Sequence, residues 1–145
     1  MPVSVIELRE QARLLEAELV RQAVVSDSTD TKAGVAVGFA GLLVGLLVQV
    51  KVANAMLHRA VVVALIAAGF GVLAAFPRRF QSPDPDVAAD LLGQLPEMEA
   101  TTLLNAIRLR SIDANRSITE SKRLLLTVTV VVLVASIVLS GLAVK

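Results

Sequence analysis

Residues 33–50, AGVAVGFAGLLVGLLVQV, decide the fold of this chain, because none of these 18 side chains carries a charge. Residues 60–76 and 124–144 form two further windows, of 17 and 21 residues, that also lack charged side chains. An apolar helix of about 17–25 residues is long enough to cross the hydrocarbon layer of a bilayer. The sequence therefore predicts an all-α integral membrane protein with three transmembrane helices, an N-terminal hairpin and a C-terminal span.

The rest of the chain divides around these windows. Residues 1–32 are expected to form a cytoplasmic amphipathic helix and 33–76 the transmembrane hairpin. Residues 77–123 are expected to form a cytoplasmic linker and helices, and 124–145 the third transmembrane helix. Of the 145 residues 55% are hydrophobic and 19% charged, so no room remains for a second, catalytic domain.

Composition also restricts the chemistry. The chain has no cysteine, which excludes disulfides, thiol catalysis and cysteine-bound metal. The single histidine, His58, is expected in a short loop between the first two spans. The formal net charge of +1 gives no indication of a nucleic-acid polymer as partner. We expect no enzymatic activity, no metal and no cofactor.

The distribution of basic residues predicts the orientation. The N-terminal segment and residues 77–123 together hold 11 Lys and Arg, whereas the hairpin loop and the C-terminus hold 3. Cytoplasmic loops carry the excess of Lys and Arg. We therefore expect a multi-pass protein of the cell inner membrane with a cytoplasmic N-terminus, anchored at the interface by Arg78, Arg79, Lys122 and Arg123.

The N-terminal segment carries apolar residues at heptad spacing. They are Val5, Leu8, Ala12, Leu15 and Leu19, between which charged side chains fill the other faces. Such a stripe predicts one apolar seam along a helix. Two uses of the seam remain open, namely self-association, or packing on the same chain or the membrane surface. The polar stretch 26–31 either ends this helix or lies within a continuous helix from about residue 4 to 50.

The first span carries four glycines spaced by four, three and four residues: Gly34, Gly38, Gly41 and Gly45. We call this set the glycine face. Small residues at such spacing let another helix backbone approach closely in a membrane. The face therefore predicts helix–helix packing, and the alternative is that it lines a pore. Since it needs a partner, we expect a homo-oligomeric helical bundle.

The third span is expected to continue a cytoplasmic helix. A short helix is predicted over about 86–95, interrupted by Pro96, and a second helix from about Glu97. No Pro or Gly lies between Glu97 and the third span. Arg108, Arg110 and Arg116 on this segment are the candidate ligand-binding residues, because guanidinium groups suit phosphate. The alternative is a solvated face with local ion pairs.

The order of these parts resembles the Pycsar transmembrane effectors and related small membrane effectors of bacterial anti-phage nucleotide signalling. The matching positions are Asp30, Lys32 and Ala33 before the first span, Pro77 and Arg78 after the second, and Lys122 before the third. The resemblance implies a cytoplasmic sensor and an oligomer that compromises the inner membrane. It also implies cyclic CMP or cyclic UMP as the partner. Outside the spans the only aromatic residue is Phe80, which offers almost nothing on which a pyrimidine could stack.

The sequence thus favours a membrane effector that oligomerises and permeabilises or depolarises the inner membrane when triggered by a cyclic nucleotide. Its partners are the lipid bilayer, further copies of itself and the nucleotide. Two alternatives remain open, a phage holin-like pore former that needs no ligand, and a non-enzymatic scaffold subunit of a larger membrane complex.

Overall fold

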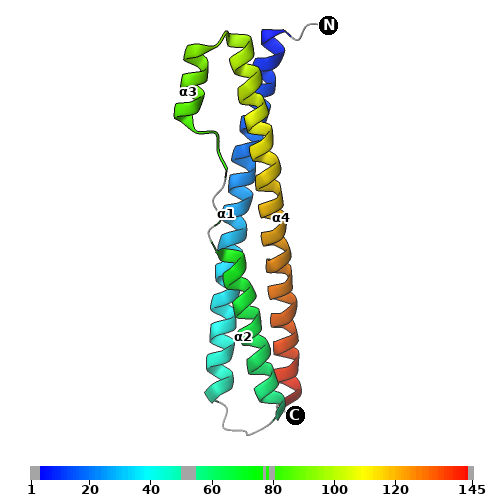
Figure 1. The fold of residues 1–145 in the computed structure, drawn as a ribbon. Coiled ribbons are helices and arrows are strands. Elements are labelled where there is room, and N and C mark those ends of the chain that lie inside the picture. Colours follow the sequence, from blue (N-terminus) through cyan, green and yellow to red (C-terminus); the bar gives the residue numbers. More distant parts are fainter. Residues whose placement is uncertain (1–3, 50–54, 77, 79–80, 144–145) are drawn as a thin grey trace. The chain divides into compact units, whose positions relative to one another are not determined.

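The computed structural model describes residues 4–49, 55–76, 78 and 81–143, and four helices lie within these ranges. They are α1 (Val5–Gln49), α2 (Ala55–Ala75), α3 (Pro85–Gln94) and α4 (Glu97–Ala143). All three of α1, α2 and α4 are long and apolar enough to cross a membrane. The prediction of an all-helical chain with three such helices is confirmed for the described residues (Figure 1).

Two questions that the sequence left open are answered by the helix bounds. The polar stretch 26–31 lies inside α1, so the first helix is continuous. The helix that begins at Glu97 does continue into the third apolar window. One expectation is wrong: His58 lies in the first turn of α2 and not in a loop, because α2 already begins at Ala55.

The chain packs as two compact units, and each contains part of α1 and part of α4. The first, the linker unit, comprises residues 1–25 and 78–119. The second, the span unit, comprises residues 26–77 and 120–145 and so holds the three apolar windows. The boundary in the first helix is therefore earlier than residue 33, where the charge-free window begins.

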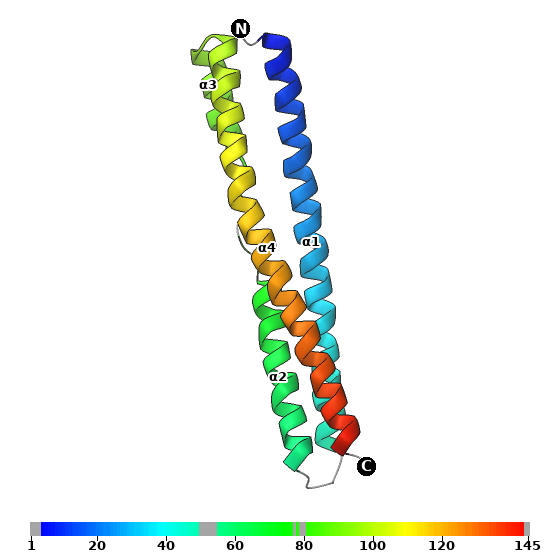
Figure 2. The ribbon, with the colours of Figure 1, turned by 90° about the vertical axis from the view of Figure 1, so that its right-hand side faces the viewer.

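In the span unit, α1, α2 and α4 lie side by side in both views of the ribbon (Figures 1 and 2). On each helix one series of buried residues recurs every seven positions, and further buried residues lie between its members. The members of the series are Ser26, Ala33, Ala40 and Leu47 on α1, Ala60, Ala67 and Ala74 on α2, and Lys122, Thr129 and Ser136 on α4. A strict seven-residue repeat is the packing period of left-handed coiled coils. The span unit is therefore a three-helix bundle whose core consists mainly of small side chains.

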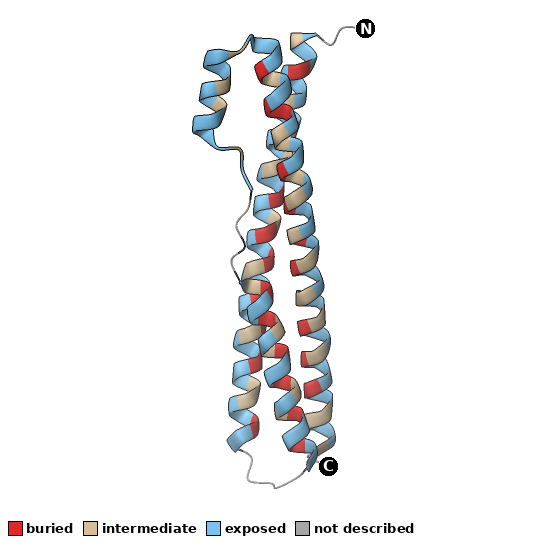
Figure 3. Cartoon of the chain, viewed as in Figure 1, coloured by how far each residue is buried: buried red, intermediate tan, exposed pale blue. Residues whose placement is uncertain are grey.

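The large apolar side chains of the span unit point outward. Phe39, Leu42, Ile66, Val131 and Val138 are all exposed, and the buried residues form only narrow stripes along each helix (Figure 3). Because lipid tails are as apolar as leucine, a membrane bundle places small residues at its helix contacts and large ones toward lipid. The distribution of side chains is thus compatible with a multi-pass membrane protein.

Gly71 is the one described glycine at which an added Cβ would meet neighbouring atoms. That Cβ would lie 2.6 Å from Cγ2 of Val37 on α1 and 3.3 Å from Cγ2 of Thr129 on α4. The close approach of α2 to both other helices therefore requires a residue without a side chain at position 71.

In the linker unit, the N-terminal part of α1 lies beside the N-terminal part of α4 (Figures 1 and 2). The Asn105 side-chain amide donates to the Leu8 carbonyl oxygen at 3.1 Å, and Arg9 forms an ion pair with Glu97. Leu8 is buried, and Val5, Ala12, Leu15 and Leu19 of the same heptad seam are half-buried. The seam thus faces α4 of its own chain, which is one of the two uses expected for it.

Helix α3 follows the linker. Asp84 caps its first turn by accepting from the Asp86 amide at 3.0 Å, and Pro85 occupies its first position, where no amide hydrogen is needed. The Leu95 amide closes it by donating to the Leu91 carbonyl at 3.1 Å. None of its residues is buried.

The environment of Gly71 gives the first prediction. Gly71→Leu should destabilise the span unit by about 1–3 kcal/mol, because the new side chain would overpack the contact of three helices. The measurement is unfolding in detergent, followed by helical circular dichroism. The control is Gly69→Leu, two residues earlier on α2, where no atom lies within 4 Å of an added Cβ. Equal stability of the two variants would contradict the packing described for α2.

Candidate functional site

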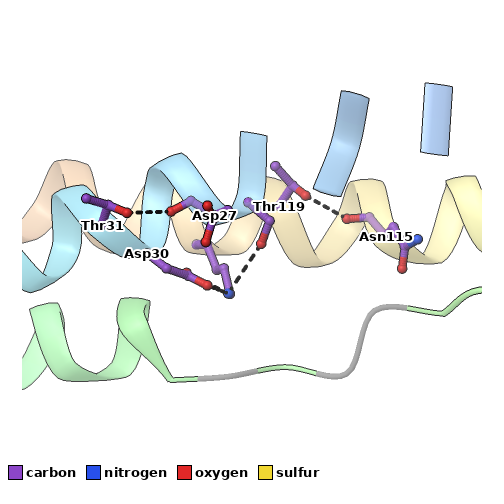
Figure 4. Close-up of polar contacts among 7 residues, drawn as sticks. Asp27, Asp30, Thr31, Asn115 and Thr119 are labelled. Carbon is purple, nitrogen blue, oxygen red and sulfur yellow. Dashed lines mark hydrogen bonds and ion pairs between the residues drawn. The ribbon is translucent and has the colours of Figure 1, made fainter. Parts of the chain in front are cut away.

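A buried ion pair joins α1 to α4 within the span unit. The Lys122 ammonium donates to Asp30 Oδ1 at 2.6 Å and to Oδ2 at 2.8 Å, and it lies 3.4 Å from Ser26 Oγ. The Lys122 side chain is only 2% exposed, whereas that of Asp30 is 33% exposed. Figure 4 shows the Asp30 carboxylate directed at this nitrogen. The three donors of the ammonium group thus have three acceptor atoms within reach.

The other buried polar groups of α4 in this unit are hydrogen-bonded too. The Ser136 hydroxyl donates to the Ala60 carbonyl of α2 at 2.7 Å, and the Thr129 hydroxyl donates to the Leu125 carbonyl of its own helix at 2.8 Å. Burying a hydroxyl without a partner would be costly. Lys122, Thr129 and Ser136 therefore form a satisfied polar stripe on the buried side of α4.

Two of the family-matching residues, which are 92 positions apart, meet in this ion pair. Ala33, one helical turn after Asp30, is fully buried, whereas Lys32 is exposed. Arg78 is exposed, and Pro77 lies outside the described residues. Lys122 is not an interfacial anchor, because its ammonium group is held by Asp30 inside the bundle, while the adjacent Arg123 is exposed.

The glycine face does not pack against the other spans of the chain. All four of its members are exposed, and no atom lies within 4 Å of a Cβ added at any of them. The buried side of α1 is instead its alanine stripe, Ala33, Ala36 and Ala40. Beside Gly34 lies an open apolar hollow of about 300 Å³, lined also by Val37 of α1 and by Val72, Ala75 and Phe76 of α2.

The three candidate arginines do not converge. At about 100° per residue, Arg110 lies on the side of α4 nearly opposite Arg108, and Arg116 lies between them two turns further on. Arg108 is half-buried, with its guanidinium 3.4 Å from Asn105 Oδ1, while Arg110 and Arg116 are exposed. This arrangement gives no geometric support to one phosphate site built from all three.

Arg116 acts electrostatically on α1. Hydrogen bonds from Arg21, at 2.8 and 2.9 Å, lower the pKa of Glu18, and the charge of Arg116 lowers it further. A carboxylate with a lowered pKa stabilises the folded state above its ordinary pKa, and this contribution is lost as the pH falls through the lowered value. Glu18 and Arg21 thus form an ion pair one helical turn apart on α1, and Arg116 belongs to the same group of charges.

Asn115 holds the segment that precedes α3 against α4 through Gln81. Its side chain accepts from the Gln81 amide and donates to the Gln81 carbonyl, both at 2.9 Å, and it is completely buried. Its own carbonyl accepts from the Thr119 hydroxyl (Figure 4). The asparagine side chain thus pairs with one peptide unit of the linker much as a neighbouring strand would.

Sequence reasoning missed Asn115, Gly71 and the partner of Ser136. A signal was present, because Lys122, Thr129 and Ser136 are the polar residues that recur every seven positions along α4. Because the repeat continues into the charge-free window 124–144, it indicates the side of the helix that faces other helices. The choice of Asp30 as the partner of Lys122 could not be read from that repeat.

The contact of Asn115 with the linker gives the second prediction. Asn115→Ala should increase the exchange rate of the Gln81 amide hydrogen about tenfold, because a lost hydrogen bond of this kind is worth about 1–3 kcal/mol. The measurement is hydrogen exchange resolved to the peptide that contains residue 81. Asp113→Ala, an exposed residue of the same helix, is the control and should leave this rate unchanged. An unaltered rate in both variants would show that the linker is held by other contacts.

Comparison of the chain with protein-family models, with curated proteins and with solved structures finds no match. The functional interpretation therefore depends on the residues and contacts described above and on the resemblance of the sequence motifs.

Proposed function

We propose that this chain is a membrane effector of bacterial anti-phage defence. In this proposal it assembles into homo-oligomers in the inner membrane and permeabilises or depolarises that membrane when a cyclic nucleotide triggers it. The observation that carries the proposal is the glycine face, a close-packing surface that is exposed on the span unit.

The dimensions of the helices support insertion in a membrane. The 21 residues of α2 measure about 30 Å along the helix axis, close to the thickness of a hydrocarbon core. The outward leucine, valine, isoleucine and phenylalanine side chains suit contact with lipid tails. The excess of Lys and Arg in residues 1–32 and 77–123 favours a cytoplasmic N-terminus.

The glycine face supports self-assembly. A flat helix surface without side chains gains little from contact with lipid and more from a helix backbone that packs closely on it. The apolar hollow beside Gly34 extends this surface onto α2. A second copy of the chain fits both features, because an oligomer would bury the face that the single bundle leaves open.

The trigger is supported by the family resemblance and not by the arrangement of the arginines. The resemblance suggests cyclic CMP or cyclic UMP. Of the three candidate arginines, Arg110 is exposed and distant from Arg108 around the helix, so a ligand would engage them separately.

The exposed glycine face gives the third prediction. Gly38→Leu and Gly41→Leu should reduce the oligomer to smaller species, because a leucine side chain would separate the helix backbones. Since both positions are open within the bundle, neither variant should unfold it. The measurement is native mass spectrometry of protein released from membranes or nanodiscs. The control is Gly141→Leu on α4, which is equally exposed and equally open.

An oligomer of unchanged mass in both glycine variants would contradict self-assembly through this face. Membrane potential in cells, read with a voltage-sensitive dye, separates the functions. Depolarisation that requires the nucleotide supports the effector, and depolarisation without any trigger supports the holin-like alternative. A potential that stays normal with and without the nucleotide favours the scaffold.

The cytoplasmic arginines give the fourth prediction. Arg108→Ala or Arg110→Ala should abolish depolarisation by cyclic CMP or cyclic UMP, because one charge-assisted contact is worth roughly 1.5–3 kcal/mol, or more than tenfold in affinity. Oligomer mass should not change. Arg13→Ala, an exposed arginine on α1, is the control. If both α4 variants respond to the nucleotide like the parent, the nucleotide does not bind these arginines.

A further inference from the structure

The Asp30–Lys122 ion pair joins α1 to α4 within the span unit, where most of the other buried side chains are small. Along α1 the buried heptad positions after Ser26 are Ala33, Ala40 and Leu47. On α4 those after Lys122 are Thr129 and Ser136. Alanine, serine and threonine have similar small volumes, so a displacement of α4 by seven residues would again place small side chains against small side chains.

The buried Lys122 makes the two registers differ in free energy. Displacing α4 by one heptad toward the C-terminal end of α1 would bring Lys122 opposite Ala33. Residues 33–50, which comprise the rest of α1 and the position after it, contain no acidic side chain that could pair with the lysine. An unpaired ammonium in an apolar interior carries a large desolvation penalty. In coiled coils, a single buried polar position is enough to select one register from several.

We propose that the Asp30–Lys122 pair is a register lock, which holds α1 and α4 in the resting arrangement of the bundle and whose opening releases the spans for permeabilisation. The second part rests on the function proposed above. The lock itself is a property of the two helices and can be tested without it.

The exposures of the two partners make the lock asymmetric. Asp30 is one-third exposed, so it retains contact with water when Lys122 is neutralised. Lys122 is almost completely buried, so it has neither water nor a counter-ion in place when Asp30 is neutralised. Asp30→Asn should therefore disturb the register more than Lys122→Met does. The double variant Asp30→Asn/Lys122→Met should recover it, because replacing both charges of a buried pair is often neutral.

The experiment uses the full chain in liposomes and in cells. Because the protein has no cysteine, the pair Ala40→Cys/Leu133→Cys can report on the register; these positions on α1 and α4 belong to one buried cluster. Oxidative cross-linking between them should be efficient in the parent background. It should fall about tenfold with Asp30→Asn, since breaking one side of a buried pair is strongly destabilising, and return in the double variant.

The matched controls are Asp27→Asn and Arg123→Met, which neutralise exposed charges next to the pair on the same two helices. Both should cross-link like the parent. Equal cross-linking in Asp30→Asn and in these controls would overturn the lock. Failure of the double variant to recover cross-linking would also overturn it, because the loss would then not come from the unpaired lysine.

Membrane potential measured in the same variants tests the second part. Asp30→Asn should depolarise cells without added nucleotide, whereas the two controls and the double variant should not. Loss of cross-linking in cells whose membrane potential stays normal would leave the lock standing and overturn its connection to permeabilisation. Depolarisation by the nucleotide in the parent chain would show in that case that the proposed function itself holds.

Discussion

Close contact among three helices through small side chains is the constraint from which the span unit follows. The buried residues of α1, α2 and α4 in this unit are mainly Ala, Ser, Thr and Gly, and the exceptions are Leu47, Leu57, Lys122 and Leu133. At Gly71 the spacing is so tight that even a methyl group would meet α1 and α4. Such contacts gain dispersion energy without needing water to be expelled, which is how helices associate in lipid. The large apolar side chains are consequently left to the outside.

The same small core makes polar groups important. Ala, Ser and Thr side chains are so similar in size that their packing distinguishes one register poorly from another. The specific contacts are hydrogen bonds: the Ser136 hydroxyl donates to the Ala60 carbonyl, and the Lys122 ammonium donates to Asp30. A charge of this kind costs more to misplace than a methyl group. The ion pair therefore adds specificity to a bundle whose apolar contacts supply mainly attraction.

The two sides of α1 have different partners. Its alanine stripe packs within the bundle, and its heptad seam near the N-terminus packs on α4 of the same chain, with Asn105 bound to the Leu8 carbonyl. The glycine face remains open. Of the two features that suggested association between copies, the seam is occupied by the chain itself, so the proposed oligomer depends on the glycines.

Local sequence features predict the three helices that are long and apolar enough to cross a membrane, the continuity of the last helix from Glu97 and the position of the short helix before it. These depend on local properties, namely the absence of charge over 17 to 21 residues and the placement of proline. The side of each helix that is buried follows from packing between helices, because alanine and glycine stripes on one apolar helix are nearly equal in hydrophobicity. The tertiary structure also decided that Lys122 meets Asp30 and that Arg108, Arg110 and Arg116 do not meet. Such pairings depend on how helices far apart in the chain are rotated and aligned, and that is set by packing between helices and not by any local pattern.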